Sequence, residues 1–528
     1  MSIWNQGERF MKTLTRLACI ITSIAISSVF AAKAPAAKQA PKQQEPLVVW
    51  IMPNGASPQE TLEQRLNLFT KKTGLKTKIV VLDWGEAWNR ISTTLSSGVD
   101  APDVLQLGTT WIPYFASRGE IKPLNEWLPK IDSSRFVPVS WNTTRIDSDT
   151  TIYSIPWFID IRPILANKRV LKKNNIKPED VATFDGFVNA IRKVNDSQET
   201  LEDGTKIRAF AFPGKSDWNI PHNFAPWVWS NGGDFISKDK EGKWKASILT
   251  PKSIYGIAKY LSFVLDSLVS TDALQMNTAQ IVQHFNAGEL AFIVNTSEVI
   301  MQTRIEGAKG GLINTGIGKD SVMALPIPTG TEGSICFIGG SNLAIPTGNK
   351  RPEALELLLY LTNDENLDAY TKQIGMLPAS KKVLTNWSKD NDYKTIVTML
   401  DFGKTYTAIP EWGDIEQILV SMFSAIWDHL EIPALYSEEK IYEILMQYSN
   451  DINKRLNHRT SDDLTFAEFR DIWHKALNIT ETKKENRNTA EQPKQVKEDD
   501  SSSGLSSWLF ALAVLAGFIF AVARKKKN

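Results

Sequence analysis

The sequence predicts an α/β fold, because short apolar runs with strand character alternate with amphipathic runs of helical character. The first run, Leu47–Met52, is apolar throughout, as strands are when both faces of a mainly parallel sheet are covered. The 528 residues are too many for one hydrophobic core, and an apolar content of 42% is that of a globular chain. We therefore expect more than one sheet, each flanked by helices and connected by right-handed crossovers.

Strand and helix signals follow in order from Pro46. Pro53-Asn54-Gly55 breaks the first strand, and Ser57, with Glu60 three residues later, can cap a helix that ends at Gly74. Two further strands and the helix between them are expected at Lys78–Leu82, Trp88–Leu95 and Val104–Leu107. Later patterns predict helices at Pro178–Val194, Ser253–Ser270 and Leu464–Leu477, and strands at Leu290–Val294 and Asn342–Ile345.

The ends of the first three strands carry candidate ligand-binding residues. Asn54, Asp83-Trp84 and Thr109-Thr110-Trp111 each follow one strand. Ligand loops in open α/β sheets extend from the carboxyl ends of the strands. A tryptophan after two of the three strands is more than chance placement would readily give.

The stretch from Thr150 to Asn167 is a candidate hinge between two halves of the chain. Two short strands are expected, Thr150–Ile155 and Pro163–Asn167. Because Pro156 and Pro163 lack an N–H donor, we predict that the segment between them is not an ordinary interior strand. This segment holds Trp157, Phe158, Asp160 and Arg162, and crevices between lobes are usual sites for small ligands. A core strand with a surface ion pair is an equally good interpretation of this stretch alone.

The N-terminus has the pattern of a cleaved secretory signal peptide, residues 1–31. Lys12 and Arg16 precede the apolar run Leu17–Phe30, which is too short to span a bilayer. Residues 32–45, rich in Ala, Lys, Gln and Pro, are expected to be a disordered leader. Removal of the signal peptide leaves Cys336 as the only thiol, so no internal disulfide can form.

The C-terminus has the pattern of a membrane anchor. Residues 481–504 are polar and predict a flexible linker, with an expected end-to-end distance of roughly 25–30 Å. Leu505–Ala523 is apolar enough for a transmembrane helix, and the basic tail, residues 524–528, would stay in the cytoplasm. The alternative is a sorting signal that is cut off at the cell surface, but no LPxTG-like motif precedes the helix.

An ordered set of short motifs resembles the family of extracellular solute-binding proteins that serve ABC-type sugar importers, the maltose-binding-like group. The resemblance covers about residues 46–450, and no single motif is specific. The motifs include Leu47-Val48-Val49-Trp50, Ala101-Pro102-Asp103-Val104, Tyr153-Ser154-Ile155-Pro156, Asn231-Gly232-Gly233-Asp234-Phe235, Phe285-Asn286-Ala287-Gly288-Glu289, Gly339-Gly340 and Gly375 with Leu377-Pro378.

The resemblance implies two α/β lobes joined by three crossings, with the solute bound between the lobes. The first lobe would take about residues 46–157 and 295–339, and the second about 163–294 and 341–450. The crossings would be the candidate hinge, Phe292–Ser297 and Gly339-Gly340-Ser341. Residues 451–480 would form a helical extension that packs on the second lobe.

A carbohydrate presents apolar C–H faces and many hydroxyl groups, so its site needs aromatic rings and planar polar groups. We expect stacking platforms at Trp84, Trp111, Trp157, Trp229 and Trp412, and hydrogen-bonding partners at Asn54, Asp83, Asp160, Arg162, Asn295, Gly340 and Glu411. Any of these tryptophans could equally be a core residue, as interior tryptophans are common. Trp50, Trp127 and Trp244 are interpreted as ordinary core or surface residues.

Nothing in the sequence favours catalysis or a metal site. The five histidines have no ligand spacing, and Gly339-Gly340-Ser341-Asn342-Leu343 lacks the second glycine of a nucleophile elbow. A net charge of +1 gives no general attraction to nucleic acid. We expect a monomeric binding protein that needs no cofactor, captures a carbohydrate and delivers it to an ABC importer. A carbohydrate sensor and a carbohydrate-active enzyme are the alternatives.

Overall fold

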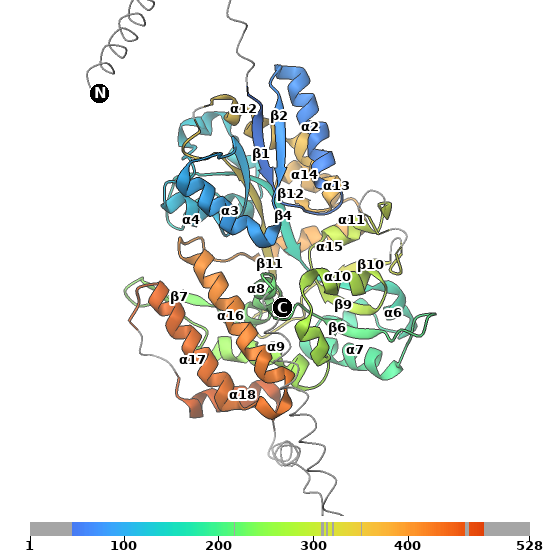
Figure 1. Cartoon of the computed structure of the whole chain (residues 1–528). Coiled ribbons are helices and arrows are strands. Elements are labelled where there is room, and N and C mark those ends of the chain that lie inside the picture. The colour runs from blue at the N-terminus through green and yellow to red at the C-terminus, as the bar shows by residue number, and fades with distance from the viewer. Residues whose placement is uncertain are drawn as a thin grey trace, which may run out of the picture.

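The computed structural model describes residues 45–479, apart from 216, 308–310, 313, 314, 319, 320, 350 and 460–463. The expected signal peptide, nearly all of the leader, the polar linker, the C-terminal apolar run and the basic tail lie outside the described residues. Within 45–479, no helix has both the length and the apolar character needed to span a bilayer. The fold is α/β with two main sheets, as the sequence predicts (Figure 1).

The first sheet lies in the upper half of the molecule in Figure 1 and has seven strands in the described residues. The order along the sheet is β12-β4-β11-β3-β1-β2, and β13 pairs with one end of β11. β1 is parallel to β2 and β3, whereas β11 runs antiparallel to β3 and β4. The strands are β1 (Leu47–Ile51), β2 (Thr77–Val81), β3 (Val104–Gly108), β4 (Ile155–Arg162), β11 (Cys336–Ala344), β12 (Leu377–Pro378) and β13 (Gly403–Lys404).

Helices from both halves of the chain cover the first sheet. The capping predicted for the first helix differs in detail: Ser57 is the N-cap but makes no side-chain cap bond, and Gly74 ends the helix in the left-handed conformation. The helices of this half are α2 (Pro58–Thr73), α3 (Trp84–Ser97), α4 (Ile112–Ser117), α5 (Pro138–Asn142), α12 (Glu353–Leu361), α13 (Asp364–Ile374) and α14 (Lys381–Trp387).

The second sheet lies in the lower half, with strand order β10-β5-β9-β6 in the described residues. β5 is antiparallel to both of its neighbours, and β6 is parallel to β9. These strands are β5 (Ile164–Asn167), β6 (Arg208–Ala211), β9 (Leu290–Val294) and β10 (Val322–Leu325). A separate hairpin, β7 (Ile236–Lys238) and β8 (Trp244–Ala246), lies beside this half.

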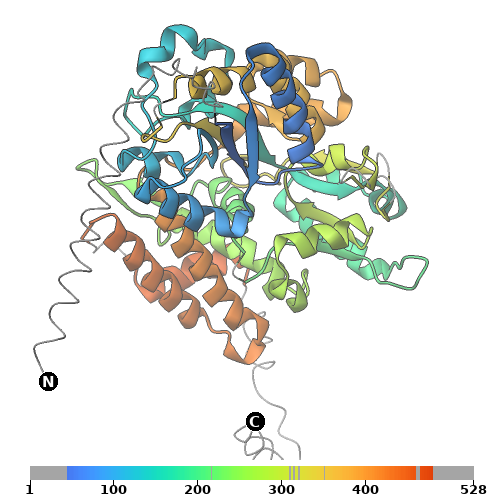
Figure 2. The ribbon, with the colours of Figure 1, turned by 45° about the horizontal axis from the view of Figure 1, so that its top comes forward.

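The second half is rich in helices, and its C-terminal helices form a group of their own at the lower left of Figure 1. α18 packs against α9 and α17 against α16, so the last described helix joins the second half. Turned forward in Figure 2, the three C-terminal helices remain together below the first sheet. The helices are α6 (Lys168–Lys173), α7 (Phe184–Ser197), α8 (Ile220–Trp229), α9 (Pro251–Leu265), α10 (Thr278–Asn286), α11 (Glu298–Gln302), α15 (Asn391–Met399), α16 (Trp412–Glu431), α17 (Glu438–Arg455) and α18 (Phe466–Leu477).

The strand pairing divides the chain differently from the expected lobe boundaries. Residues 322–325, expected in the first lobe, form β10 and pair with β5 of the second sheet. Residues 353–387, expected in the second lobe, form helices of the first half, where α12 and α13 pack on α2. Gly339-Gly340-Ser341, expected to be a crossing, lies inside β11, and the chain returns to the first sheet between β10 and β11.

The candidate hinge is also more regular than its prolines suggest. β4 runs from Ile155 to Arg162 and is an interior strand, between β12 and β11, so our prediction that this segment is not an interior strand was wrong. The missing N–H of Pro156 is tolerated because the pairing with β11 is irregular at Ser341 and Asn342, which face this end of β4. The chain leaves the first sheet at Pro163 and enters the second at Ile164.

Candidate functional site

A cavity of about 630 Å³ lies between the two sheets. The first half contributes the loops that follow β1, β2 and β3, together with β4 and β11. The second half contributes the segment before α8 and one residue of α8, part of α10, the loop after β9 with the start of α11, and one residue of α16. Both halves of the molecule therefore face one cavity of the size that usually holds a small ligand.

The carboxyl ends of β1 and β3 are held together by one buried side chain. Gln106 accepts a hydrogen bond from the Met52 backbone N–H (2.9 Å) and donates to Asn54 Oδ1 (3.1 Å) and Ser341 Oγ (2.9 Å). Gln106 thus fixes the loop after β1 against β11. Reasoning from the sequence did not identify this residue. The available signal was a glutamine inside an otherwise apolar strand.

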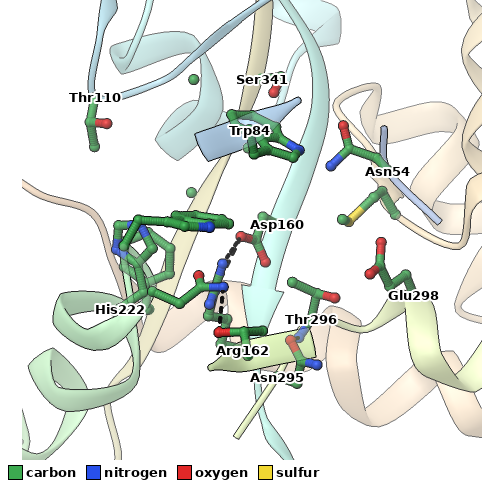
Figure 3. Close-up of a pocket in the computed structure, with 18 of the residues that line it drawn as sticks. Asn54, Trp84, Thr110, Asp160, Arg162, His222, Asn295, Thr296, Glu298 and Ser341 are labelled. Atoms are coloured by element: carbon green, nitrogen blue, oxygen red, sulfur yellow. Dashed lines mark hydrogen bonds and ion pairs between the residues drawn. The ribbon is translucent and has the colours of Figure 1, made fainter. Parts of the chain in front are cut away.

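A buried ion pair lies in the centre of the cavity (Figure 3). Arg162 donates from Nη2 to Asp160 Oδ2 at 2.9 Å and from Nε at 3.2 Å, and the Arg162 side chain is 2% exposed. The guanidinium lies over the rings of Trp218 and Phe337, at 5.9 and 5.6 Å. The Asp160 and Arg162 side chains are two residues apart on β4, so both lie on the same face of the strand. That face lines the cavity.

Several polar atoms of this cavity are buried and unsatisfied. Among the described residues, Asp160 Oδ1, Arg162 Nη1 and Asn219 Oδ1 have no hydrogen-bond partner. Buried polar groups in folded proteins are almost always paired, because an unpaired group forfeits its hydration. Atoms of this kind gathered beside one cavity are candidates for pairing with a ligand.

Tryptophans form a platform on the first half and reach across to the second. Trp84 and Trp88 both meet Trp111 edge to face, at centroid distances of 5.7 and 5.4 Å. Trp84 is oriented by a hydrogen bond from Nε1 to the Pro53 carbonyl (2.9 Å), and it stacks on Trp218 of the second half at 5.7 Å and 18°. Trp218 is 40% exposed, which is unusual for so large an apolar side chain.

A glutamate and a histidine close one side of the cavity. His222 lies 3.2 Å from Glu416 through Nε2 and 3.1 Å from the Tyr406 hydroxyl through Nδ1. Burial, with the nearby charge of Arg162, lowers the pKa of His222 well below its ordinary value, so the imidazole is neutral. Burial raises the pKa of Glu416 to about 7, against the opposing effects of a hydrogen bond from Thr110 and of Arg162.

Glu298, at the start of α11, is a second carboxyl group with a raised pKa. Burial and the negative charge of Asp160 raise its pKa to about 7. In Figure 3, Glu298 stands across the cavity from His222, with Asn295 and Thr296 below it. Near neutral pH, Glu298 and Glu416 can therefore each donate a hydrogen bond as an acid or accept one as an anion.

The structure brings together eight of the twelve candidate residues around the cavity. They are Asn54, Asp83, Trp84, Trp111, Asp160, Arg162, Asn295 and Gly340. Two of these have structural roles: the Asp83 side chain caps α3 by accepting from the Gly85 N–H at Oδ1, and Gly340 approaches β4 so closely that a Cβ would lie 2.2 Å from the Phe158 carbonyl oxygen.

The other four candidates do not line the cavity. Trp157 is buried and stacks on Tyr370 at 4.4 Å, on the opposite face of β4. Trp229 is buried and donates to Asp234, and Trp412 stacks on Tyr406 at 4.4 Å. Glu411 precedes α16. Trp218, His222, Glu298 and Glu416, which sequence reasoning missed, line the cavity.

Comparison with known proteins identifies the family. Residues 64–395 match the model of the bacterial extracellular solute-binding protein family. The chain belongs to this family. Within the described residues, the acidic, histidine and cysteine side chains form no cluster that could hold a metal ion.

Three proteins illustrate what this chain is similar to. The chain is 26% identical to the diacetylchitobiose-binding protein DasA of Streptomyces coelicolor, over 70% of this chain and 82% of the relative. An ABC-transporter solute-binding protein of Thermotoga lettingae, solved with α-D-tagatose, has the same fold, with TM-score 0.66, 19% identity and coverage of 78% of this chain and 100% of its own. The maltotriose-binding protein of Thermus thermophilus, solved with maltotriose, gives a TM-score of 0.62, 16% identity and coverage of 77% and 100%.

Proposed function

We propose that this solute-binding protein captures a neutral oligosaccharide in the cavity between its two halves and delivers it to an ABC-type importer. The observation that carries the proposal is the combination at one place of unsatisfied buried polar atoms and tryptophan rings. Sugars need both kinds of group, since their hydroxyls form hydrogen bonds and their C–H faces stack on aromatic rings.

The charges around the cavity favour a neutral ligand over an anionic one. Among the described residues, the charged lining consists of the carboxyl groups of Asp83, Asp160, Asp217, Glu298 and Glu416 and the guanidinium of Arg162, which is already paired with Asp160. A carboxylate or phosphate on the sugar would meet this excess of negative charge in a partly desolvated site. Hydroxyl groups, in contrast, can donate to the carboxylates and accept from Arg162.

Capture would proceed by closure of the two halves around the sugar. Asp160 and Arg162 lie on β4, directly before the chain crosses to the second sheet at Pro163, and Asn295 lies where the chain leaves β9. A sugar bound to groups from both halves stabilises the closed arrangement more than the open one, which is what shifts the population. The binding energy would thereby be used to form the surface that an importer recognises.

The proposal extends to how the protein is held at the membrane. We expect the N-terminal apolar run to direct export and the C-terminal run, residues 505–523, to anchor the protein with its binding domain outside the cytoplasm. The polar linker, with an expected end-to-end distance of roughly 25–30 Å, would hold the binding domain off the membrane and within reach of importer subunits in the same bilayer. We propose binding without chemical conversion of the sugar.

The test is titration calorimetry with the oligosaccharides that the relatives bind, diacetylchitobiose and maltotriose, and with arabino-oligosaccharides. Wild-type protein is expected to bind one of these series and to reject oligogalacturonates, which carry a carboxylate on each unit. Replacing the platform residue in Trp84→Ala should weaken binding by roughly 1–4 kcal/mol, and Trp127→Ala should not. Failure to bind any neutral series, equal affinities of the two variants, or release of shorter sugars after incubation would overturn the proposal.

A further inference from the structure

A second cavity, of about 650 Å³, lies next to the first. Thr109 and Thr110, which follow β3, line both cavities. From the first half the second cavity is lined by the segment 142–149 after α5. From the second half it is lined by the β7–β8 hairpin, through Lys238 and Trp244, and by the segment 405–408. This second chamber is therefore another space between the two halves, and it adjoins the first at Thr109 and Thr110.

The partition between the two chambers is thin and polar. Tyr406 lines the second chamber, and its hydroxyl lies 3.1 Å from Nδ1 of His222, which lines the first. Thr110 lines both chambers and hydrogen-bonds to Glu416 of the first. A chain of sugar units that passes Thr110 would thus move from the Glu416 side of the first chamber into the second without leaving hydrogen-bonding partners.

The lining of the second chamber repeats the chemistry of the first. Trp244 is half-buried and offers an aromatic face, with the Lys238 ammonium 4.7 Å from its ring centroid. Seven hydroxyl and amide side chains also line the chamber, beside the charged groups of Arg145, Asp147, Asp149 and Lys238; the seven are Thr109, Thr110, Asn142, Thr143, Ser148, Thr405 and Thr407. Aromatic rings among hydroxyl and amide groups suit sugar units, whereas an apolar ligand would leave these polar groups unpaired.

Contacts across the second chamber join the two halves at its outer edge. Lys238 of the hairpin lies 3.3 Å from Asp147 of the first half, and the Asp147 N–H donates to the Ala408 carbonyl at 2.7 Å. Arg145, in the same segment as Asp147, donates to Asn142 Oδ1. This chamber thus has both positive and negative side chains, so its charge favours neither a cationic nor an anionic ligand.

We propose that the second chamber is an additional subsite, which takes the further units of an oligosaccharide too long for the first chamber. This inference rests on the proposed function. Each chamber falls within the range of about 300–1,000 Å³ typical of small-ligand pockets, so the two together exceed what a disaccharide fills. Trp244, which the sequence alone suggested was an ordinary core or surface residue, is the aromatic platform of this subsite.

The experiment measures affinity against ligand length by calorimetry on the whole extracytoplasmic domain. The probes are N-acetylchito-, malto- and arabino-oligosaccharides, each from the disaccharide to the hexasaccharide. In the series that binds, wild-type affinity is expected to rise about tenfold or more with length, the gain of one more stacked ring and its hydrogen bonds. Trp244→Ala should lose this gain while it keeps the wild-type affinity for the disaccharide.

Two further variants separate the subsite from effects on folding. Ala408→Trp fills the second chamber without removing a side-chain contact, and it should also abolish the gain for long ligands only. Trp127→Ala, a half-buried tryptophan outside both chambers, should retain it. Affinity independent of length in wild type, or a full gain in both Trp244→Ala and Ala408→Trp, overturns the subsite alone. Absence of binding by every series overturns the proposed function and the subsite with it.

Discussion

Replacing Glu416 by glutamine should make the protein more stable at neutral and alkaline pH. Glu416 is 6% exposed, and its raised pKa means that the folded protein holds a proton which the unfolded chain releases. The stability that this proton contributes is fully present below the unfolded pKa of 4.5 and is lost as the pH rises through about 7. Glutamine does not titrate, and its amide can still donate to Nε2 of His222.

The difference between a pKa of about 7 in the folded protein and 4.5 in the unfolded chain corresponds to about 3 kcal/mol. Glu298 has a pKa raised to about 7 for similar reasons, so wild-type stability should fall through the same window at two sites. The single variant Glu416→Gln should therefore remove about half of the decline, and Glu416→Gln combined with Glu298→Gln should remove more of it.

The assay is urea unfolding of the extracytoplasmic domain at a series of pH values between the two pKa values and above them. It requires no ligand, which makes it independent of the proposed function. Glu63→Gln, on the exposed face of α2, is the matched control and should give a curve parallel to wild type. If the unfolding free energy of Glu416→Gln also runs parallel to that of wild type across this pH window, Glu416 does not hold a proton in the folded protein. The electrostatic account of the cavity would then be wrong.

Three further predictions concern other parts of the molecule. Trp412→Ala removes a buried ring that stacks on Tyr406, so it should cost about 3–5 kcal/mol of unfolding free energy in urea titrations; a cost below that of an exposed substitution would contradict its core role. Burial raises the pKa of Cys336 to about 12, so iodoacetamide should label it only after denaturation, and reducing agent should leave the thermal midpoint unchanged; rapid labelling of native protein would disagree. A reporter fused after Asn528 should be active only in the cytoplasm, whereas mature protein lacking residues 505–523 would indicate a cleaved sorting signal.

The sequence could locate the cavity because part of its position follows from local rules. Asn54, Trp84 and Trp111 follow β1, β2 and β3, which are parallel neighbours, so their loops must meet at one edge of the sheet. The same reasoning could have gone further on β4. Phe158, Asp160 and Arg162 alternate along the strand and line the cavity, so the period of two places Trp157 on the other face.

The remaining differences come from contacts between distant parts of the chain. Val322–Leu325 and Cys336–Ala344 both read as strands, and nothing local says that the first joins β5 and the second joins β3 and β4. The same holds for Glu416, which lines the cavity one helical turn after Trp412, while Trp412 packs behind Tyr406. Which side of a helix faces a cavity depends on the partner helix, and that partner is set by tertiary packing.

The position of the ion pair suits the proposal that the binding site and the candidate hinge occupy the same strand. Asp160 and Arg162 lie on β4 immediately before the crossing at Pro163, Arg162 buried and Asp160 partly buried, and each has an oxygen or nitrogen without a partner. Leaving such groups unpaired costs free energy in the unliganded protein. A sugar that satisfies them recovers this cost only when Asn295 and the tryptophans are also in reach, which requires one particular arrangement of the two halves. The ligand therefore binds that arrangement more tightly than the others. A ligand shifts a conformational equilibrium only by the difference between its affinities for the two conformations.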